Sequence, residues 1–170
     1  DLERRIAADP KHYVAHNLLG ELLRRDGDLD AALAHFSTAT GINPEWVVPY
    51  INAVTVYLSQ DKATDALALL ERARTATKDS LPILRQTALL HERMGDRGAA
   101  RSVYEQILAA SPQALDAANN LAVLLTQGDY SAADLDRAFE LASRFESAQN
   151  PLYRNTLGWV LVLRGELVAA

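Results

Sequence analysis

Three short patterns in the sequence contain residue types that can do chemistry, and the first is a pair of histidines. His12 and His16 are four residues apart, which places both rings on one face of a helix at a spacing that can chelate a metal ion. No third ligand is evident near them in the sequence. We therefore favour a packing role for His16 and expect neither a metal site nor a cofactor.

The second pattern is an alternation of aspartates at Asp26, Asp28 and Asp30. Calcium loops alternate their carboxylates in this way, but they also need a glycine at the sharp turn and a bidentate glutamate at the end. Ala31 and Ser37 stand at those two places. We interpret the segment as a solvated turn in which Asp28 lies near the N-cap of a helix.

The third pattern, Ser59 followed by Lys62, has the spacing of a serine–lysine nucleophile. It crosses a turn between two predicted helices and lacks the companion motifs, so we interpret it as a chance match. The chain also has no phosphate-binding glycine loop, no His-Glu-x-x-His motif and no carboxylate pair in a predicted closed pocket. We predict that the protein is not an enzyme.

The composition excludes several classes of protein. Hydrophobic residues make up 49% of the chain, and the formal net charge is −5. Nucleic-acid-binding proteins usually carry a basic stripe, so we expect no nucleic-acid partner. The absence of cysteine excludes a disulfide framework and a thiolate zinc site but leaves the compartment open, either the cytoplasm or a bacterial periplasm or envelope. The longest uncharged run, residues 46–60, is too short to span a bilayer, so we expect no membrane span.

The positions of these residues follow an internal repeat of 34 residues. Pro10, Pro44 and Pro112 differ by 34 and by twice 34, and small residues recur at the same interval. In the first copy, apolar residues at helical spacing fill two segments on either side of a Gly27-Asp28 break. The period therefore predicts an array of helical hairpins.

The repeated positions resemble the tetratricopeptide family across the whole chain. The family unit has a large residue, then Leu-Gly, then an aromatic residue on its first helix, followed by Ala, a large apolar residue and Pro on its second. The matching residues are His16, Leu19, Gly20, Leu23, Ala32, Phe36 and Pro44 in the first copy; Tyr50, Ala53, Val54, Tyr57, Ala66 and Leu70 in the second, with Lys78 in place of proline; Leu84, Thr87, Ala88, His91, Ala100, Tyr104 and Pro112 in the third; Ala118, Leu121, Ala122 and Leu125 in the fourth; and Arg154, Leu157, Gly158 and Leu161 in the fifth. The general style of the sequence resembles bacterial members.

The resemblance implies an all-α fold, an alpha-alpha superhelix built from antiparallel helix pairs. We expect a single array over residues 1–170, comprising the end of a preceding repeat (1–12), repeats at 13–46, 47–80, 81–114 and 115–150, and the start of a fifth (151–170). The expected helices span 2–8, 12–26, 29–40, 46–59, 63–77, 81–94 and 97–109. Residues 1–8 then belong to a repeat that begins further upstream, so we expect the sequence to be part of a longer protein.

The fourth repeat departs from the pattern at its central turn. Ala138 lies ten positions after Gly128, whereas Ala32 lies only five positions after Gly27. We expect a bulged turn at residues 130–134 and, because the next repeat begins only two residues late, a shortened connection to the fifth repeat. We also expect Pro151 in the first turn of the following helix.

The resemblance implies that the first helices of successive repeats line a concave groove. The residues that we expect to bind a partner there are Asn17, Glu21, Arg24, Asn52, Arg85, Glu92, Asn119, Asn120, Asn155 and Trp159. Most of them are polar, and we expect a polar groove. The asparagines either pair with the backbone of a peptide or link one repeat to the next, and the sequence leaves both roles open. The lysine and asparagine set with which chaperone-binding relatives hold a terminal carboxylate is not reproduced, because Ile51 and Arg85 interrupt it.

The predicted function is therefore a non-catalytic scaffold for protein–protein interaction, holding a peptide segment or a protein surface in the groove. The alternative is a regulatory or scaffolding arm of a larger enzyme or of a secretion or envelope assembly. We also expect self-association through the C-terminal end, because the apolar residues Leu157, Val160, Leu161 and Leu163 lack a following helix. The competing possibility is that residues 167–170 fold back and shield them.

Overall fold

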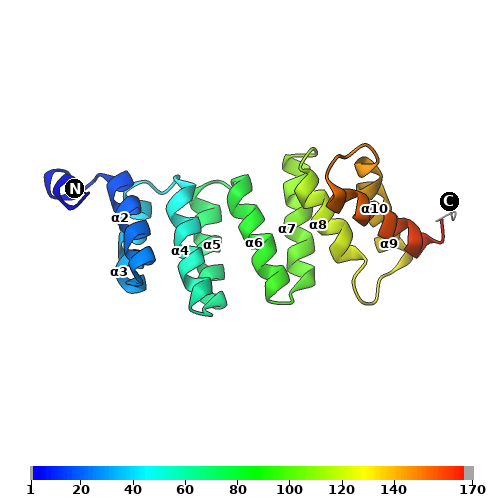
Figure 1. Ribbon diagram of the computed structural model, residues 1–170, viewed down its shortest axis with the longest axis horizontal. Helices are drawn as coiled ribbons and strands as arrows, with labels where there is room; N and C mark the ends of the chain where they lie inside the picture. The colour runs from blue at the N-terminus through cyan, green and yellow to red at the C-terminus, as the bar shows by residue number, and fades with distance from the viewer. Residues whose placement is uncertain (1, 167–170) are drawn as a thin grey trace. The chain divides into compact units, whose positions relative to one another are not determined.

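The computed structural model describes residues 2–166, and over that range the chain forms ten α-helices, one short 3₁₀ helix and no strand (Figure 1). The helices are α1 (Leu2–Ala8), α2 (Tyr13–Asp26), α3 (Leu29–Ile42), α4 (Val47–Ser59), α5 (Ala63–Ala76), α6 (Leu81–Arg93), α7 (Arg97–Ala110), α8 (Leu115–Leu125), α9 (Ala132–Ala142), η1 (Ser143–Phe145) and α10 (Pro151–Arg164). The all-α prediction is confirmed, and the bounds of α1 to α7 lie within two residues of those expected.

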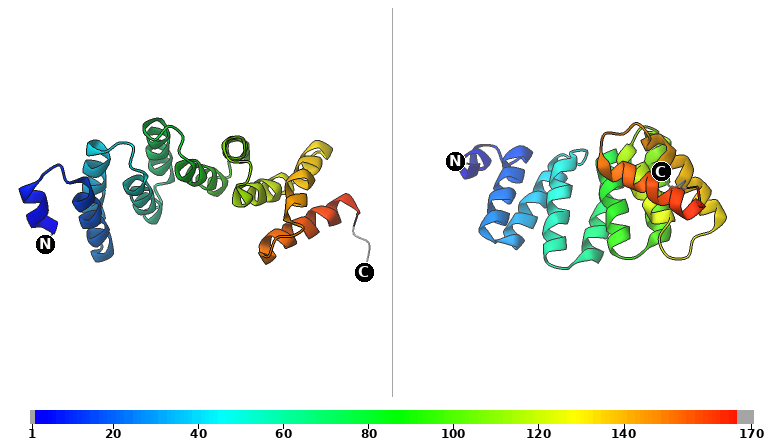
Figure 2. Two further views of the ribbon diagram at one scale, coloured as in Figure 1. Left: turned by 90° about the horizontal axis from the view of Figure 1, so that it is seen from above. Right: turned by 45° about the vertical axis from the view of Figure 1, so that its right-hand side comes forward.

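The chain divides into two compact units, Asp1–Met94 and Gly95–Ala170. The division falls in the turn between α6 and α7, inside the segment that the sequence assigns to the third repeat. We call these the first unit and the second unit and describe each by itself. Within a unit, consecutive helices pack side by side as antiparallel neighbours (Figure 2).

The first hairpin of the first unit shows why two helices form here. Asp28 caps α3, its carboxylate accepting a hydrogen bond from the Ala31 backbone N–H at 3.2 Å, as the sequence predicts. Gly27 ends α2 with a φ of +89°, a conformation that glycine adopts without strain. Gly20 lies so close to Phe36 that a Cβ on it would be 2.7 Å from the ring. The Leu-Gly motif therefore marks a close approach of α2 and α3.

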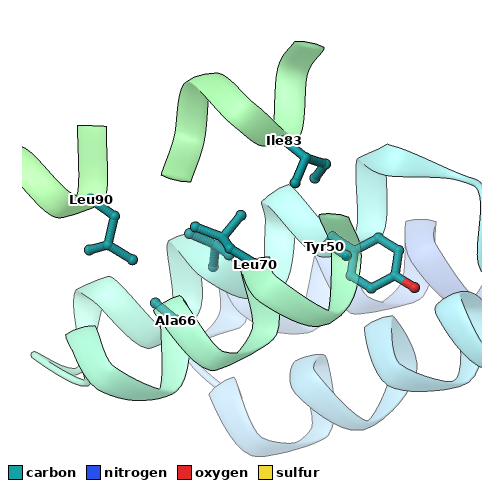
Figure 3. Packing of buried hydrophobic residues seen from close by; sticks show 7 residues of the cluster. Tyr50, Ala66, Leu70, Ile83 and Leu90 are labelled. Carbon is teal, nitrogen blue, oxygen red and sulfur yellow. The ribbon is translucent and has the colours of Figure 1, made fainter. Parts of the chain in front are cut away.

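The core of the first unit continues through α4, α5 and α6. Its buried members are Tyr50, Val54, Ala66, Leu70, Ala73, Ile83 and Leu90 (Figure 3). The α4 segment is rich in β-branched residues, yet it forms a helix, with Pro49 in the first turn, where a missing N–H costs little. Burial of Val54 and Val56 between neighbouring helices outweighs their weak helix propensity.

The central turn of the second unit is longer than the others, as expected, but it is not where the sequence places it. Six residues, 126–131, separate α8 from α9, whereas two separate α2 from α3. The expected bulge at 130–134 is wrong in its second half, because Ser131 and Asp134 form a capping box that starts α9. Hydrogen bonds from Ser131, and less strongly from Arg101, lower the pKa of Asp134 to about 2.

The connection from α9 to α10 also differs from the prediction. It comprises eight residues, 143–150, against four between α7 and α8, so it is longer rather than shorter. The shortened element is α9 itself, with 11 residues against 14 in α7. Part of the connection is the 3₁₀ helix, which carries the fully buried Phe145 against Tyr153 with ring centroids 5.1 Å apart. Pro151 begins α10, as expected.

Candidate functional site

Helices α2 and α4 carry a small amide network. The Asn52 side-chain amide donates to Asn17 Oδ1 at 3.0 Å and to Glu21 Oε1 at 2.9 Å. Asn17 donates to the same Glu21 oxygen at 2.8 Å. Asn17 is only 3% exposed, so these bonds satisfy polar groups that are shielded from water. The network links the first repeat to the second.

A second set of hydrogen bonds lies in the second unit, on α8. Asn119 Oδ1 accepts from the Thr156 hydroxyl at 2.7 Å, which joins α8 to α10. The neighbouring Asn120 donates to the Tyr104 hydroxyl at 3.1 Å, which joins α8 to α7. The asparagines of α4 and α8 thus hold helices of successive repeats together, which is one of the two roles that the sequence leaves open.

The remaining expected site residues take no part in these hydrogen bonds. Arg24, Arg85 and Glu92 are half-buried on α2 and α6. Asn155 is exposed on α10, and Trp159 is 52% exposed on the same helix. Asn155 and Trp159 therefore present most of their side chains to solvent, whereas Arg24, Arg85 and Glu92 do so only in part.

The first helices of the hairpins also expose apolar side chains. On α10, Leu152, Trp159 and Val162 are 67%, 52% and 49% exposed. Together with Asn155 they are spaced at three or four residues, so they form one stripe along the helix. In the first unit, Val48 on α4 and Leu89 on α6 are exposed as well. Trp159 is one of the expected site residues, whereas the exposed Leu152 and Val48 were not predicted.

The two histidines of the sequence motif do not converge. His12 caps α2, its Nδ1 accepting from the Ala15 N–H at 3.2 Å. His16 is buried and pairs instead with His35 on α3, with the two Nδ1 atoms 2.9 Å apart. Because His16 Nε2 lies 3.1 Å from the Pro10 carbonyl, it must carry a hydrogen, and in neutral His16 the Nδ1 then accepts from His35. His16 has the packing position expected, but its partner His35 was not predicted.

The residues of the serine–lysine pattern also have structural roles. Ser59 donates its hydroxyl to the Val56 carbonyl at 2.7 Å at the end of α4, and the backbone of Lys62 caps α5. Over residues 2–166 no cluster of three histidine, cysteine or acidic residues has the arrangement of a metal site. In the same range no helix is long and apolar enough to cross a membrane.

The apolar residues near the end of α10 form only part of the exposed contact surface that the sequence predicts. Val160 is fully buried, so it cannot belong to an exposed contact surface. Leu157 and Leu161 are half-buried and, with Phe139, Ser143 and Glu146, line a cavity of about 220 Å³ between α9 and α10. Residues 167–170, which were considered as a possible shield, lie outside the described residues.

Comparison with solved structures places this arrangement among known folds. YrrB, described as a TPR protein with an unusual peptide-binding site, is 14% identical, with a TM-score of 0.71 over 97% of this chain and 84% of its own. Yeast Tom70 is 15% identical, with a TM-score of 0.72 over 97% of this chain and 35% of its own. PilW, described as a type IV pilus biogenesis factor, is 21% identical, with a TM-score of 0.65 over 97% of this chain and 76% of its own. At these identities the likeness concerns the fold alone.

The family assignment rests on the sequence as well as on the fold. No curated protein matches the chain. The tetratricopeptide repeat family matches residues 1–45 and 85–151, which together are more than half of the chain. With the helical hairpins and the close contact at Gly20 in agreement, the chain belongs to the tetratricopeptide repeat family.

Proposed function

We propose that this chain is a non-catalytic interaction module that binds a peptide segment or a protein surface on the inward faces of its first helices. The tetratricopeptide fold is typical of protein–protein interaction scaffolds, whose stacked repeats present extended binding surfaces. The residues proposed to contact the partner are Glu21, Arg24, Arg85, Glu92, Asn155 and Trp159, with the remaining asparagines chiefly holding the repeats.

The observation that carries this proposal is the stripe of Leu152, Trp159 and Val162 on α10. Each of the three is about half or more exposed, although burying such side chains on folding is favourable. Large apolar residues of this kind are the usual anchors of a protein interface, and tryptophan is prominent among the side chains that contribute most to binding. Asn155 in the same stripe adds a donor and an acceptor that fix the orientation of a bound backbone.

A binding experiment with immobilised protein tests the proposal. The double variant Trp159→Ala, Val162→Ser should weaken capture of a partner by tenfold or more, roughly the effect of losing one interface anchor. Tyr130→Ala is the matched control, because Tyr130 is an exposed aromatic residue in the α8–α9 turn. Equal loss in both variants, or loss in the control alone, would place the binding surface elsewhere.

The same experiment separates the proposal from its alternative. If the partner is held in a groove, a short synthetic peptide derived from that partner should displace it. An arm of a larger enzyme or assembly instead co-purifies with its neighbour at a fixed ratio, and no short peptide displaces it. The second result would favour the alternative function.

Self-association belongs to the same proposal, with a second copy of this chain as the occupant of the cavity lined by Phe139, Leu157 and Leu161. An uncovered apolar surface of this kind is a natural contact site. Sedimentation velocity at increasing concentration should show a dimer, and Leu161→Glu should shift the protein to the monomer. Val160 is unsuitable for this test, because an acidic residue there would disrupt the core. A parent protein that stays monomeric throughout would reject the idea.

A further inference from the structure

A small cavity in the first unit combines an apolar floor with a polar rim. It has a volume of about 60 Å³ and lies among α3, α4 and α5. The floor is formed by Leu33, Phe36, Ala53 and Leu69, and the rim by Ser37, Thr40, Tyr50, Tyr57 and Arg72. None of the residues of the proposed binding face lines it.

The rim holds hydrogen-bond donors that the described part of the chain leaves unused. Tyr50 is only 4% exposed, and over residues 2–166 its hydroxyl makes no hydrogen bond. Figure 3 shows that hydroxyl pointing away from Leu70 and the other labelled core residues. The Tyr50 ring is buried, but its hydroxyl oxygen is not among the side-chain atoms that are shielded from solvent and lack a partner. The hydroxyl can therefore donate to a group that enters the cavity from outside.

Arg72 is the one charged side chain among the described residues that line the cavity. Within residues 2–166 its guanidinium has no carboxylate partner, whereas Arg74 on the same helix pairs with Glu71 and Asp79. Burial raises the pKa of the Tyr50 phenol, and the positive charge of Arg72 opposes that rise. Tyr50 is therefore a neutral donor that lies within the electrostatic reach of a cation.

The size and charge of the cavity select one kind of group. On the same measure a water molecule needs at least about 10–15 Å³, so the cavity accommodates a group of a few heavy atoms. One guanidinium balances one negative charge and matches a planar carboxylate. The apolar floor suits the methylene groups next to such a carboxylate.

We propose that this cavity binds a single carboxylate, supplied by an acidic side chain of a protein partner, with Arg72 as the cation and Tyr50 and Tyr57 as hydroxyl donors. The site is separate from the inward faces of the helices, so it does not depend on the function proposed above. It would give the protein a second contact point for an acidic partner.

Titrations followed by nuclear magnetic resonance test the proposal with defined probes. N-acetylglutamate amide should shift the Arg72 side-chain N–H signal and the Tyr50 ring signals saturably, and N-acetylglutamine amide, which lacks the charge, should not. Arg72→Gln should abolish binding, and Tyr50→Phe should weaken it by about tenfold, the effect of losing one hydrogen bond to a charged group. Tyr57→Phe provides a second test in case Tyr50→Phe impairs folding.

The controls decide between the remaining outcomes. Arg93→Gln makes the same charge change at another exposed arginine of the first unit and should bind like the parent. Equal response to the glutamate and glutamine probes, or unchanged binding in Arg72→Gln, would overturn the proposal. Binding of free propionate without binding of the glutamate probe would overturn the assignment to a protein side chain.

Discussion

Helices α2 and α10 carry the same residues at three equivalent positions, yet these residues do different things. Asn17, Leu19 and Gly20 on α2 correspond to Asn155, Leu157 and Gly158 on α10. A Cβ added at Gly20 would meet Phe36 at 2.7 Å, whereas a Cβ at Gly158 would have no described atom within 4 Å. Asn17 is buried in a hydrogen-bonded network, and Asn155 is exposed. The motif sets the helix face on which a residue lies. How closely the neighbouring helix packs there determines which side chain fits.

The largest expected effect is a difference in stability between substitutions at the two glycines. Gly20→Ala should reduce the free energy of unfolding by about 1–3 kcal/mol, because the added methyl group overpacks the contact with Phe36. Gly158→Ala should be neutral or stabilising by up to about 1 kcal/mol, since alanine is the better helix former where nothing crowds it. Chemical denaturation of both variants measures the difference.

A double-mutant cycle identifies the cause of the loss. Replacing Phe36 by leucine removes the ring atoms that Gly20→Ala would meet, so the cost of Gly20→Ala should shrink in the Phe36→Leu background. Strictly additive effects would mean that the ring contact is not the reason for glycine at this position.

The next effect concerns the asparagines. Asn17→Ala should reduce the free energy of unfolding by about 1–2 kcal/mol, because Asn52 loses an acceptor and Glu21 loses a donor in a shielded place. Asn155→Ala should change it by less than about 0.5 kcal/mol, as is usual for exposed positions. If thermal denaturation gave equal losses for both variants, the network would contribute nothing that an exposed asparagine does not.

The smallest expected effect is a pH dependence in the first hairpin. Burial, and then the neighbouring His16, lower the pKa of His35 in the folded protein. The unfolded chain therefore binds the proton more readily, so His35 contributes full stability above the ordinary histidine pKa of about 6.5 and loses it as the pH falls below that value. Denaturation curves on both sides of this pH should show the loss.

His35→Gln is the matched variant for that prediction, because glutamine can still donate a hydrogen bond to His16 but does not titrate. Its free energy of unfolding should fall less steeply with decreasing pH than that of the parent. An unchanged slope would show that His35 is not the source of the pH dependence.

Much of the fold follows from the sequence because its determinants are local. The 34-residue period and the apolar spacing set which face of each helix is buried, and Asp28 and Gly27 start and stop helices through their own backbone preferences. Even α4, whose β-branched residues favour a strand locally, follows the repeat. Helix bounds could therefore be predicted to within one or two residues over the first seven helices.

The fourth turn shows both a missed local signal and a contact that is not local. Its extra length is visible in the sequence, and the start of α9 is decided by the capping box of Ser131 and Asp134, a local pattern that the prediction overlooked. Arg97 at the start of α7 adds a contact that no local pattern contains, because its guanidinium donates to the carbonyls of Leu124 and Gln127 at the end of α8. The sequence predicted a lengthened turn but not its position.

The sequence by itself determined the repeat, the helical hairpins and the absence of recognisable catalytic motifs. Only the tertiary structure decided that His16 meets His35, that Asn52 bonds to Asn17 and Glu21, that Trp159 stays exposed and that Arg72 and Tyr50 share a cavity. The reason is that these contacts join residues on different helices, so they depend on how the helices cross and on which side chains the neighbouring helix covers. A periodic pattern records the buried face of a helix, whereas the partner of each side chain is set by packing between helices.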